Sequence, residues 1–125
     1  MIKTSGLHHI HLVVRDMQRS LRFYQSVFGM EEQFRVGPQM IFLSTPGSRD
    51  LITLNEDATE RDRAGQSGGI AHFGFQLSRG ASLDDAVREV EEGGGRVISR
   101  GEHTPGVPFV YVADPDGYVI ELGNP

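Results

Sequence analysis

Histidine and glutamate side chains stand inside apolar segments at three places in the chain. The segment LHHIHLVV at residues 7–14 holds three histidines, His72 begins the run HFGFQL, and Glu121 lies in the run YVIEL. Imidazole and carboxylate together are ligands for Fe(II), Mn(II), Co(II), Ni(II) and Zn(II). Three protein ligands leave coordination positions open, which is typical of catalytic metal sites. Two of these imidazoles and the carboxylate would make such a site if the fold brings them together.

Alternation along the predicted strands places the polar side chains on one face. In residues 7–14, His9 and His11 lie opposite the isoleucine and leucine that alternate with them. His72 lies opposite Phe73 and Phe75 in the same way, and Glu121 lies opposite the apolar residues on either side of it. Each of the three strands therefore presents an apolar face to a core and a second face that carries a candidate ligand.

The predicted elements occur in the same order in the two halves of the chain. A strand, a helix and three strands are expected at 7–14, 15–30, 30–36, 39–45 and 50–55, and again at 69–77, 82–94, 96–100, 107–113 and 118–122. Self-similarity of this kind indicates a duplication. The sequence predicts an α+β fold of two βαβββ modules, which form a half-open barrel around a metal site. Its 125 residues are expected to make one domain: module 1 at about 7–55, a polar linker at 56–69, and module 2 at about 70–123.

Helix boundaries in both halves are marked by capping residues. Asp16 is the expected N-cap of the first helix, and Gly29 is its expected C-terminal stop. Ser82 and Asp85 form a capping box at the start of the second helix. His9 and His72 take equivalent places in the first strands of the two modules, each opposite an unbroken apolar face, which favours a joint role with Glu121 as metal ligands.

Composition excludes several classes of protein. The net charge is −5 and the 12 lysines and arginines are scattered, so nucleic acid is not an expected partner. No apolar run approaches the roughly 18 residues of a membrane span, and no signal peptide is visible at the N-terminus. The absence of cysteine excludes a thiol nucleophile and thiolate ligands. We expect a cytoplasmic protein whose partner is a small-molecule substrate.

Three segments together resemble the vicinal oxygen chelate superfamily, which includes glyoxalase I, extradiol dioxygenases, fosfomycin-resistance enzymes and bleomycin-binding proteins. These segments are HIHLVVRDMQRSLRFYQSVFGM, GIAHFGFQL and ADPDGYVIEL. The resemblance covers essentially the whole chain and implies paired βαβββ modules around one divalent metal ion per site. It matches the family's ligands to His9, His72 and Glu121. It also implies a homodimer, in which His9 of one chain can share a site with His72 and Glu121 of the other.

Two positions bear on which branch of the family the chain resembles. Glyoxalase I has a fourth ligand, a glutamate, where this chain has Thr53, so a three-ligand site is expected here. Extradiol dioxygenases carry a tyrosine ten residues before the last ligand, and Tyr111 stands at that distance from Glu121. The fosfomycin-resistance enzymes carry the same tyrosine, so it does not discriminate between these two branches. A second histidine that those dioxygenases place before His72 has no counterpart. The resemblance favours a dioxygenase-like site with Fe(II), while Zn, Ni, Mn or Co are alternatives.

Further residues are expected around the metal. His11 is the candidate general acid or base, since imidazole is the side chain most often used for proton transfer near neutral pH; Tyr111 and Glu121 are the other candidate catalytic residues. The expected substrate pocket consists of Met40, Phe42, Thr53, Phe109 and His103. Alternation leaves open whether Met40 and Phe42 or their neighbours Ile41 and Leu43 face the pocket. His103 lies on a Gly/Pro-flanked loop, either as a lid or exposed to solvent.

The function expected from these residues is a divalent-metal-dependent, dioxygenase-like enzyme. Its substrate would be a small organic molecule with vicinal oxygens, activated by the metal as a Lewis acid. One alternative is a glyoxalase-like lyase or isomerase. Another is a ligand- or antibiotic-binding protein without turnover.

Overall fold

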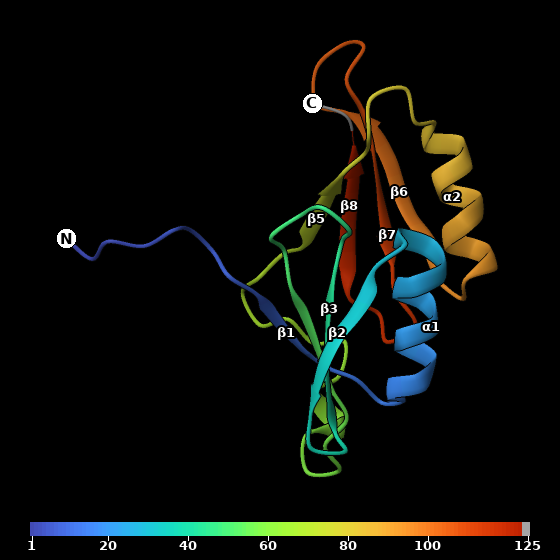
Figure 1. Cartoon of the computed structure of the whole chain (residues 1–125). Helices are drawn as coiled ribbons and strands as arrows, with labels where there is room; N and C mark the ends of the chain where they lie inside the picture. The colour runs from blue at the N-terminus through green and yellow to red at the C-terminus, as the bar shows by residue number, and fades with distance from the viewer. Residues whose placement is uncertain (124–125) are drawn as a thin grey trace.

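The duplicated pattern of the sequence corresponds to two four-stranded sheets in a computed structural model, which describes residues 1–123 (Figure 1). The strand orders are β1-β4-β3-β2 and β5-β8-β7-β6, with the first strand of each module parallel to the last. The predicted α+β fold of two βαβββ modules is confirmed. The elements are β1 (Ile10–Val13), α1 (Met17–Phe28), β2 (Glu31–Val36), β3 (Met40–Ser44), β4 (Ile52–Asn55), a 3-10 turn (Arg61–Arg63), β5 (Phe73–Gln76), α2 (Leu83–Glu92), β6 (Arg96–Glu102), β7 (Pro108–Ala113) and β8 (Val119–Gly123).

The two modules share details of strand register. The β2–β3 pairing shifts between Glu32 and Phe34, and the β6–β7 pairing shifts at the corresponding point, between Val97 and Ser99. A bulge adds one unpaired residue and increases the local twist of the strand. The same irregularity at the same place in both modules supports the duplication inferred from the sequence.

The predicted helix caps are confirmed. The Asp16 carboxylate accepts a hydrogen bond from the Arg19 backbone N–H at 3.0 Å, and the Ser82 hydroxyl accepts one from Asp85 N–H at 3.2 Å. Gly29 ends α1 in the left-handed conformation, with φ 65°. Glycine adopts this conformation without the steric cost that a Cβ atom brings. No helix among residues 1–123 is long and apolar enough to cross a membrane.

The first strand is shorter than the sequence predicts. It begins at Ile10 rather than at residue 7: Ile10 pairs with Ile52, the first residue of β4, and its N–H donates to the Leu51 carbonyl at 3.1 Å. His8 and His9 therefore precede the strand, on the exposed segment that leads away from the fold (Figure 1).

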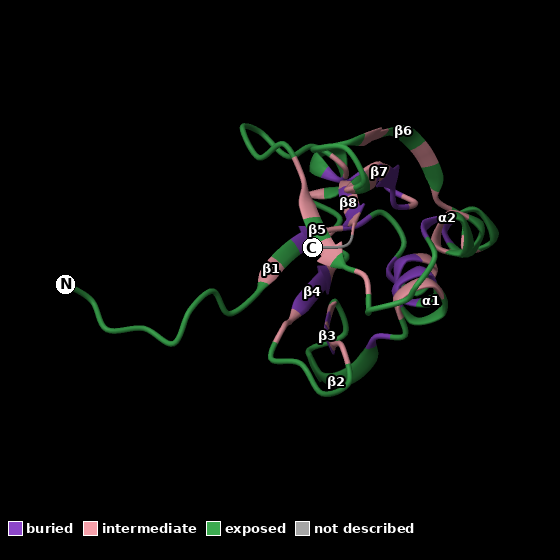
Figure 2. Ribbon diagram, turned by 90° about the horizontal axis from the view of Figure 1, so that it is seen from above, coloured by how far each residue is buried: buried purple, intermediate pink, exposed green. Residues whose placement is uncertain are grey.

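Both helices lie on the same side of the two sheets and cover their apolar faces. Seen from above, the buried residues are concentrated between the strands and the helices (Figure 2). Phe23 and Tyr24 of α1 are fully buried there. At the end of α1, Phe28 stacks on Phe75 of β5 with ring centroids 4.1 Å apart. Helix α1 of module 1 thus packs against module 2 as well.

A polar cluster at the β7–β8 turn also joins the modules. Asp116 accepts hydrogen bonds from Arg15 N–H at 3.0 Å and from the Arg19 guanidinium at 3.0 Å, and its second oxygen accepts one from Ser20 at 3.2 Å. Tyr24 donates to Asp114 at 2.7 Å. The loop DPDG is therefore held against α1 by buried, charge-assisted hydrogen bonds, which are the stronger kind. We call this cluster the α1 clamp.

Candidate metal centre

The Glu121 carboxylate on β8 lies between two imidazoles. Nε2 of His72 is 3.3 Å from Oε2, and Nε2 of His103 is 2.6 Å from Oε1. The Glu121 side chain is 23% exposed, so the group is accessible from outside the chain. Residues from three separate parts of module 2 meet at this carboxylate.

An aromatic row on β7 connects the two imidazoles. The His72 and Tyr111 rings are 5.0 Å apart, Tyr111 and Phe109 are 5.0 Å apart, and Phe109 stacks on His103 at 4.4 Å. Tyr111 is paired in register with Glu121 across the β7–β8 ladder. The row is the face of β7 opposite Val110 and Val112, which are fully buried in the core. Strand alternation thus brings the row to the face that carries Glu121.

Gly74 of β5 lies beside Glu121, on the side opposite Tyr111 of β7, and carries no side chain that would fill the space there. It is paired with Glu121 across β5–β8, and a Cβ atom there would lie 3.0 Å from the Glu121 carbonyl oxygen. This residue was not recognised from the sequence as part of the site. Comparison of the two modules would have identified it, since it takes the place that His11 takes in module 1.

His9 lies in module 1 and immediately precedes β1, just as His72 immediately precedes β5. Its ring is exposed, and its Nδ1 lies 2.9 Å from Nδ1 of His8, so one of the two rings donates a proton to the other. Its position in the repeat is the one predicted.

Thr53 of β4 takes the place that Glu121 takes in module 2, because both pair with the first strand and the third strand at equivalent positions. Its neighbours are His11 and Phe42, where Glu121 has Gly74 and Tyr111. Thr53 is fully buried, and its hydroxyl has no hydrogen-bond partner within residues 1–123. Thr53 is thus covered in module 1, while the equivalent Glu121 is accessible in module 2, where the neighbour on the first strand is Gly74 rather than His11.

The other candidate residues of module 1 lie on the face of Thr53. Ile41 and Leu43 are fully buried in the core, so Met40 and Phe42 are on the opposite face of β3. Phe42 stacks on the half-exposed Phe34 with centroids 4.4 Å apart. This resolves the alternative that the sequence left open.

His11 lines a separate pocket. The pocket lies between β1 and the linker, and its other polar lining residues include Arg63, Gln66 and Tyr118. The predicted site residues therefore fall into two groups, which approach one another where His9 lines a pocket together with Gly74, the residue paired with Glu121. Module 2 brings together His72, His103, Phe109, Tyr111 and Glu121, while His9, His11, Met40, Phe42 and Thr53 belong to module 1.

The donor atoms of module 2 fit a divalent metal. Ligand atoms at about 2.1 Å from one ion lie on the order of 3 Å apart, and His72 Nε2 and Glu121 Oε2 are separated by 3.3 Å. Within residues 1–123 of one chain, however, no three His, Asp or Glu side chains are arranged to hold an ion together. A single chain supplies two of the three expected ligands at this place.

The architecture is that of the vicinal oxygen chelate fold, as the resemblance implied. Residues 6–122 match the Glyoxalase/Bleomycin resistance protein/Dioxygenase superfamily, and the chain belongs to this superfamily.

Individual relatives span most of the chain. It is 31% identical over 122 residues to uncharacterized protein PA2024 of Pseudomonas aeruginosa, which covers 93% of this chain and 86% of that protein. It is 31% identical over 112 residues to catechol-2,3-dioxygenase of Bacillus subtilis, covering 89% of this chain but only 38% of that protein. The fosfomycin resistance protein FosX of Listeria monocytogenes has the same fold, with a TM-score of 0.78 at 23% identity over 98% of this chain and 95% of that one.

Proposed function

We propose that the chain is a divalent-metal-dependent enzyme with a dioxygenase-like site formed by His9, His72 and Glu121. Fe(II) is the favoured ion, and the substrate class is small organic molecules with vicinal oxygens. The observation that carries the proposal is the convergence of His72 and Glu121 at 3.3 Å. Imidazole and carboxylate on one accessible face are the ligand types that Fe(II) and related ions take.

The third ligand in this proposal is His9 of a second copy of the chain. One chain places His9 and the His72–Glu121 pair in different modules, and each module leaves its polar face without a covering element. A twofold dimer would set module 1 of one copy over module 2 of the other and so complete two identical sites. The exposed rings of module 1, Phe34 among them, would then be covered.

The chain's own residues would share the chemistry as follows. A bound divalent ion would act as a Lewis acid toward the substrate oxygens, and Fe(II) would in addition give access to dioxygen chemistry. Tyr111 lies beside His72 and Glu121 in the register, so its phenol is placed to donate a hydrogen bond to a bound substrate oxygen. His11, from the module that supplies His9, would take up or return a proton.

Apolar side chains would shape the pocket. Met40 and Phe42 line the module 1 side, and Phe109 lines the module 2 side next to Tyr111. Aromatic and thioether walls would accept the apolar body of the substrate while the metal takes its oxygens.

Two findings favour the dioxygenase-like function over a glyoxalase-like one. The first is the 31% identity to a catechol-2,3-dioxygenase. The second is Thr53, which stands where a fourth ligand would be expected and is fully buried between His11 and Phe42. A covered threonine hydroxyl is a poor ligand for these metals.

Anaerobic reconstitution with Fe(II) tests the proposed reaction. We expect the loaded protein to consume dioxygen in the presence of at least one member of a panel of substituted catechols. The Glu121→Gln variant keeps the shape of the side chain but removes its charge, so it should lose at least about 100-fold in rate if the carboxylate is a metal ligand. Dioxygen consumption is followed with an oxygen electrode.

Other outcomes would replace this function. Turnover of a 2-oxoaldehyde–thiol adduct with Ni(II) or Zn(II), without dioxygen uptake, would establish the glyoxalase-like alternative. Metal-independent binding of a small molecule with no turnover would establish a binding protein.

A further inference from the structure

The hairpin that joins β6 to β7 is longer than its counterpart in module 1. In module 1 the last pair before the turn is Val36 with Met40, and the equivalent pair in module 2 is Gly101 with Phe109. Module 2 continues past this point with Glu102 paired to Pro108 and a turn at 103–107. His103 is part of this extension, which has no equivalent beside Thr53.

The extension holds the His103 imidazole in a defined place although 54% of the side chain is exposed. His103 N–H donates to the Val107 carbonyl at 3.0 Å, and Val107 N–H donates to Thr104 at 2.9 Å, which closes the turn. The imidazole stacks on Phe109 at an interplanar angle of 24°. The ring itself contacts Phe109 by stacking and Glu121 by a hydrogen bond.

Gly101 is required for this stacking. A Cβ atom at position 101 would lie 2.8 Å from the tip of the Phe109 ring, closer than real Cβ contacts occur. Because position 101 of β6 carries no side chain, the Phe109 ring can lie across this strand and stack on His103.

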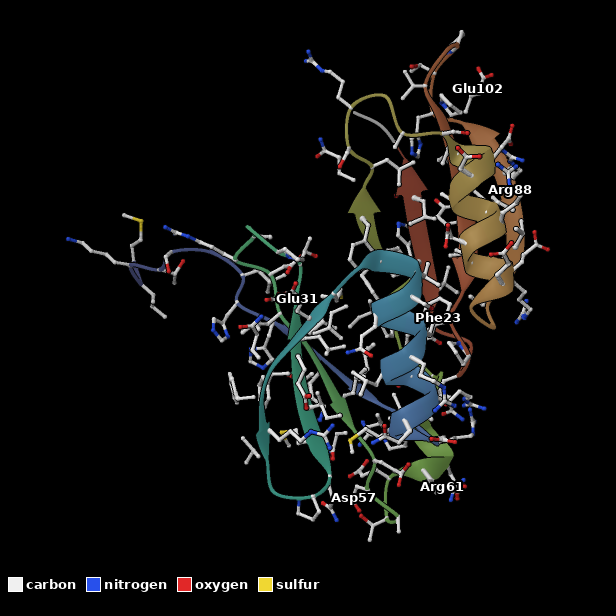
Figure 3. All side chains as sticks on the ribbon, turned by 45° about the vertical axis from the view of Figure 1, so that its right-hand side comes forward. Phe23, Glu31, Asp57, Arg61, Arg88 and Glu102 are labelled. Atoms are coloured by element: carbon white, nitrogen blue, oxygen red, sulfur yellow. The ribbon has the colours of Figure 1, made fainter. Side chains whose placement is uncertain are left out.

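The linker of the same chain does not reach this place. Asp57 and Arg61 of the linker lie at the opposite end of the molecule from Glu102, which marks the β6–β7 hairpin (Figure 3). Within residues 1–123, His103 is thus held by its own hairpin and by Glu121 of β8.

We propose that His103 is a positioning residue for the metal ligand Glu121. Its Nε2–H donates to Oε1 at 2.6 Å and so leaves Oε2, the oxygen nearer His72, directed to the metal. This inference rests on the proposed function, because it assigns His103 a role toward the metal proposed there. Hydrogen bonds to a ligating carboxylate fix its orientation, and their loss typically weakens metal binding by about 10- to 100-fold.

The geometry separates this role from that of a ligand. His103 and His72 approach different oxygens of the carboxylate, and the three side chains are not arranged around a common point within the described chain. A neutral imidazole protonated at Nε2 has no lone pair on that atom to give to a metal, since the lone pair is on Nδ1.

Metal titration of three variants beside the parent protein tests the proposal. Two metal ions serve as probes. Binding of Mn(II) is measured by calorimetry, and the visible absorption of bound Co(II) reports the number and type of ligands. His103→Ala should bind Mn(II) about 10- to 100-fold more weakly, with the shape of the Co(II) spectrum unchanged. His103→Gln, whose amide N–H can also donate to a carboxylate, should recover most of the affinity. Thr104→Ala, in the same turn, is the matched control and should bind as the parent does.

Each contrary result has a separate meaning. If the parent and His103→Ala bind Mn(II) equally, the positioning role is wrong while the metal site stands. If His103→Gln fails to recover affinity and the Co(II) spectrum of both variants shows one ligand fewer, His103 is a ligand and the positioning role is again wrong. If the parent itself binds neither Mn(II) nor Co(II), the proposed function fails, and the role of His103 fails with it.

Discussion

Thr53 and Glu121 show how neighbouring residues decide what one position in a duplicated fold can do. Both lie on the last strand of their module, at the same place in the ladder. Thr53 is fully buried and is paired with His11 and Phe42, whereas Glu121 is paired with Gly74 and remains accessible. At this position of the ladder, the second module therefore offers an accessible carboxylate and the first module a buried hydroxyl.

Substitution of Thr53 by valine tests whether this position is merely structural. Its buried hydroxyl has no hydrogen-bond partner in the part of the chain that the structure describes, and an unsatisfied buried polar group costs about 1 kcal/mol or more. Valine has nearly the same shape, so we expect Thr53→Val to raise the free energy of unfolding in urea by about 1 kcal/mol and to leave metal binding unchanged.

Thr45→Val is the matched control, because the Thr45 hydroxyl donates to Asp50 at 2.8 Å and its loss should be destabilising. A loss of stability or of metal in Thr53→Val would mean that the Thr53 hydroxyl binds a ligand or a water molecule.

The chemistry of individual residues could be predicted from the sequence only in part. Alternation placed His11, Tyr111 and Glu121 on the correct faces, because each strand has an uninterrupted apolar face. The choice between Met40 and Ile41 could not be made, since both sides of β3 are apolar. The contact of His103 with Glu121 could not be predicted either, because it depends on the conformation of the turn between β6 and β7 relative to β8.

At the scale of elements, the α1 clamp fixes the relation between the two modules. Asp116 and its partners in α1 are about 100 residues apart in sequence, so no local pattern indicates their contact. The caps of α1 and α2, by contrast, depend on residues within one turn of the helix and were predicted correctly. Local rules thus gave the elements, while long-range polar contacts determine how the modules are joined.

Burial gives the clamp a pH dependence. Burial raises the pKa of Asp114, against the hydrogen bonds from Tyr24 and Tyr118 N–H that lower it. Burial also raises the pKa of Tyr24 well above its ordinary value, and the nearby charges of Asp114 and Asp116 raise it further. The folded chain keeps the Tyr24 proton at a pH where the unfolded chain has begun to lose it. The stability that this group contributes is therefore complete below about pH 10 and decreases as the pH rises.

We expect the free energy of unfolding to decrease above about pH 10 by up to about 1.4 kcal/mol per pH unit from Tyr24. Tyr24→Phe should remove most of this dependence, although Tyr118, whose pKa burial also raises, remains. At pH 7 the same variant should be about 2 kcal/mol less stable, because it leaves a buried oxygen of Asp114 without its partner. Urea unfolding followed by circular dichroism between pH 7 and 11 measures both effects. If the parent's free energy of unfolding does not decrease above pH 10, Tyr24 ionises as readily in the folded chain as in the unfolded one.

At the scale of the whole molecule, the two groups of candidate residues belong to different modules of one chain. The fold was predicted as two modules, and this is confirmed. Both helices lie on one side of the two sheets (Figure 2), and α1 packs against module 2 through Phe28 and Phe75. A site completed by a second copy of the chain is the arrangement that uses all three proposed ligands.

Metal content in mixed dimers tests this arrangement most directly. The measurement is elemental analysis of the parent protein, of His9→Ala and His72→Ala separately, and of the two variants unfolded together and refolded as a mixture. We expect one divalent ion per chain in the parent and little metal in either variant alone. In a random mixture, half of the dimers would contain one chain of each kind and hence one intact site, so about a quarter of the parent's metal should return. No recovery in the mixture, with the parent fully loaded, would place all ligands within one chain, and a parent that takes up no metal would contradict the metal site itself.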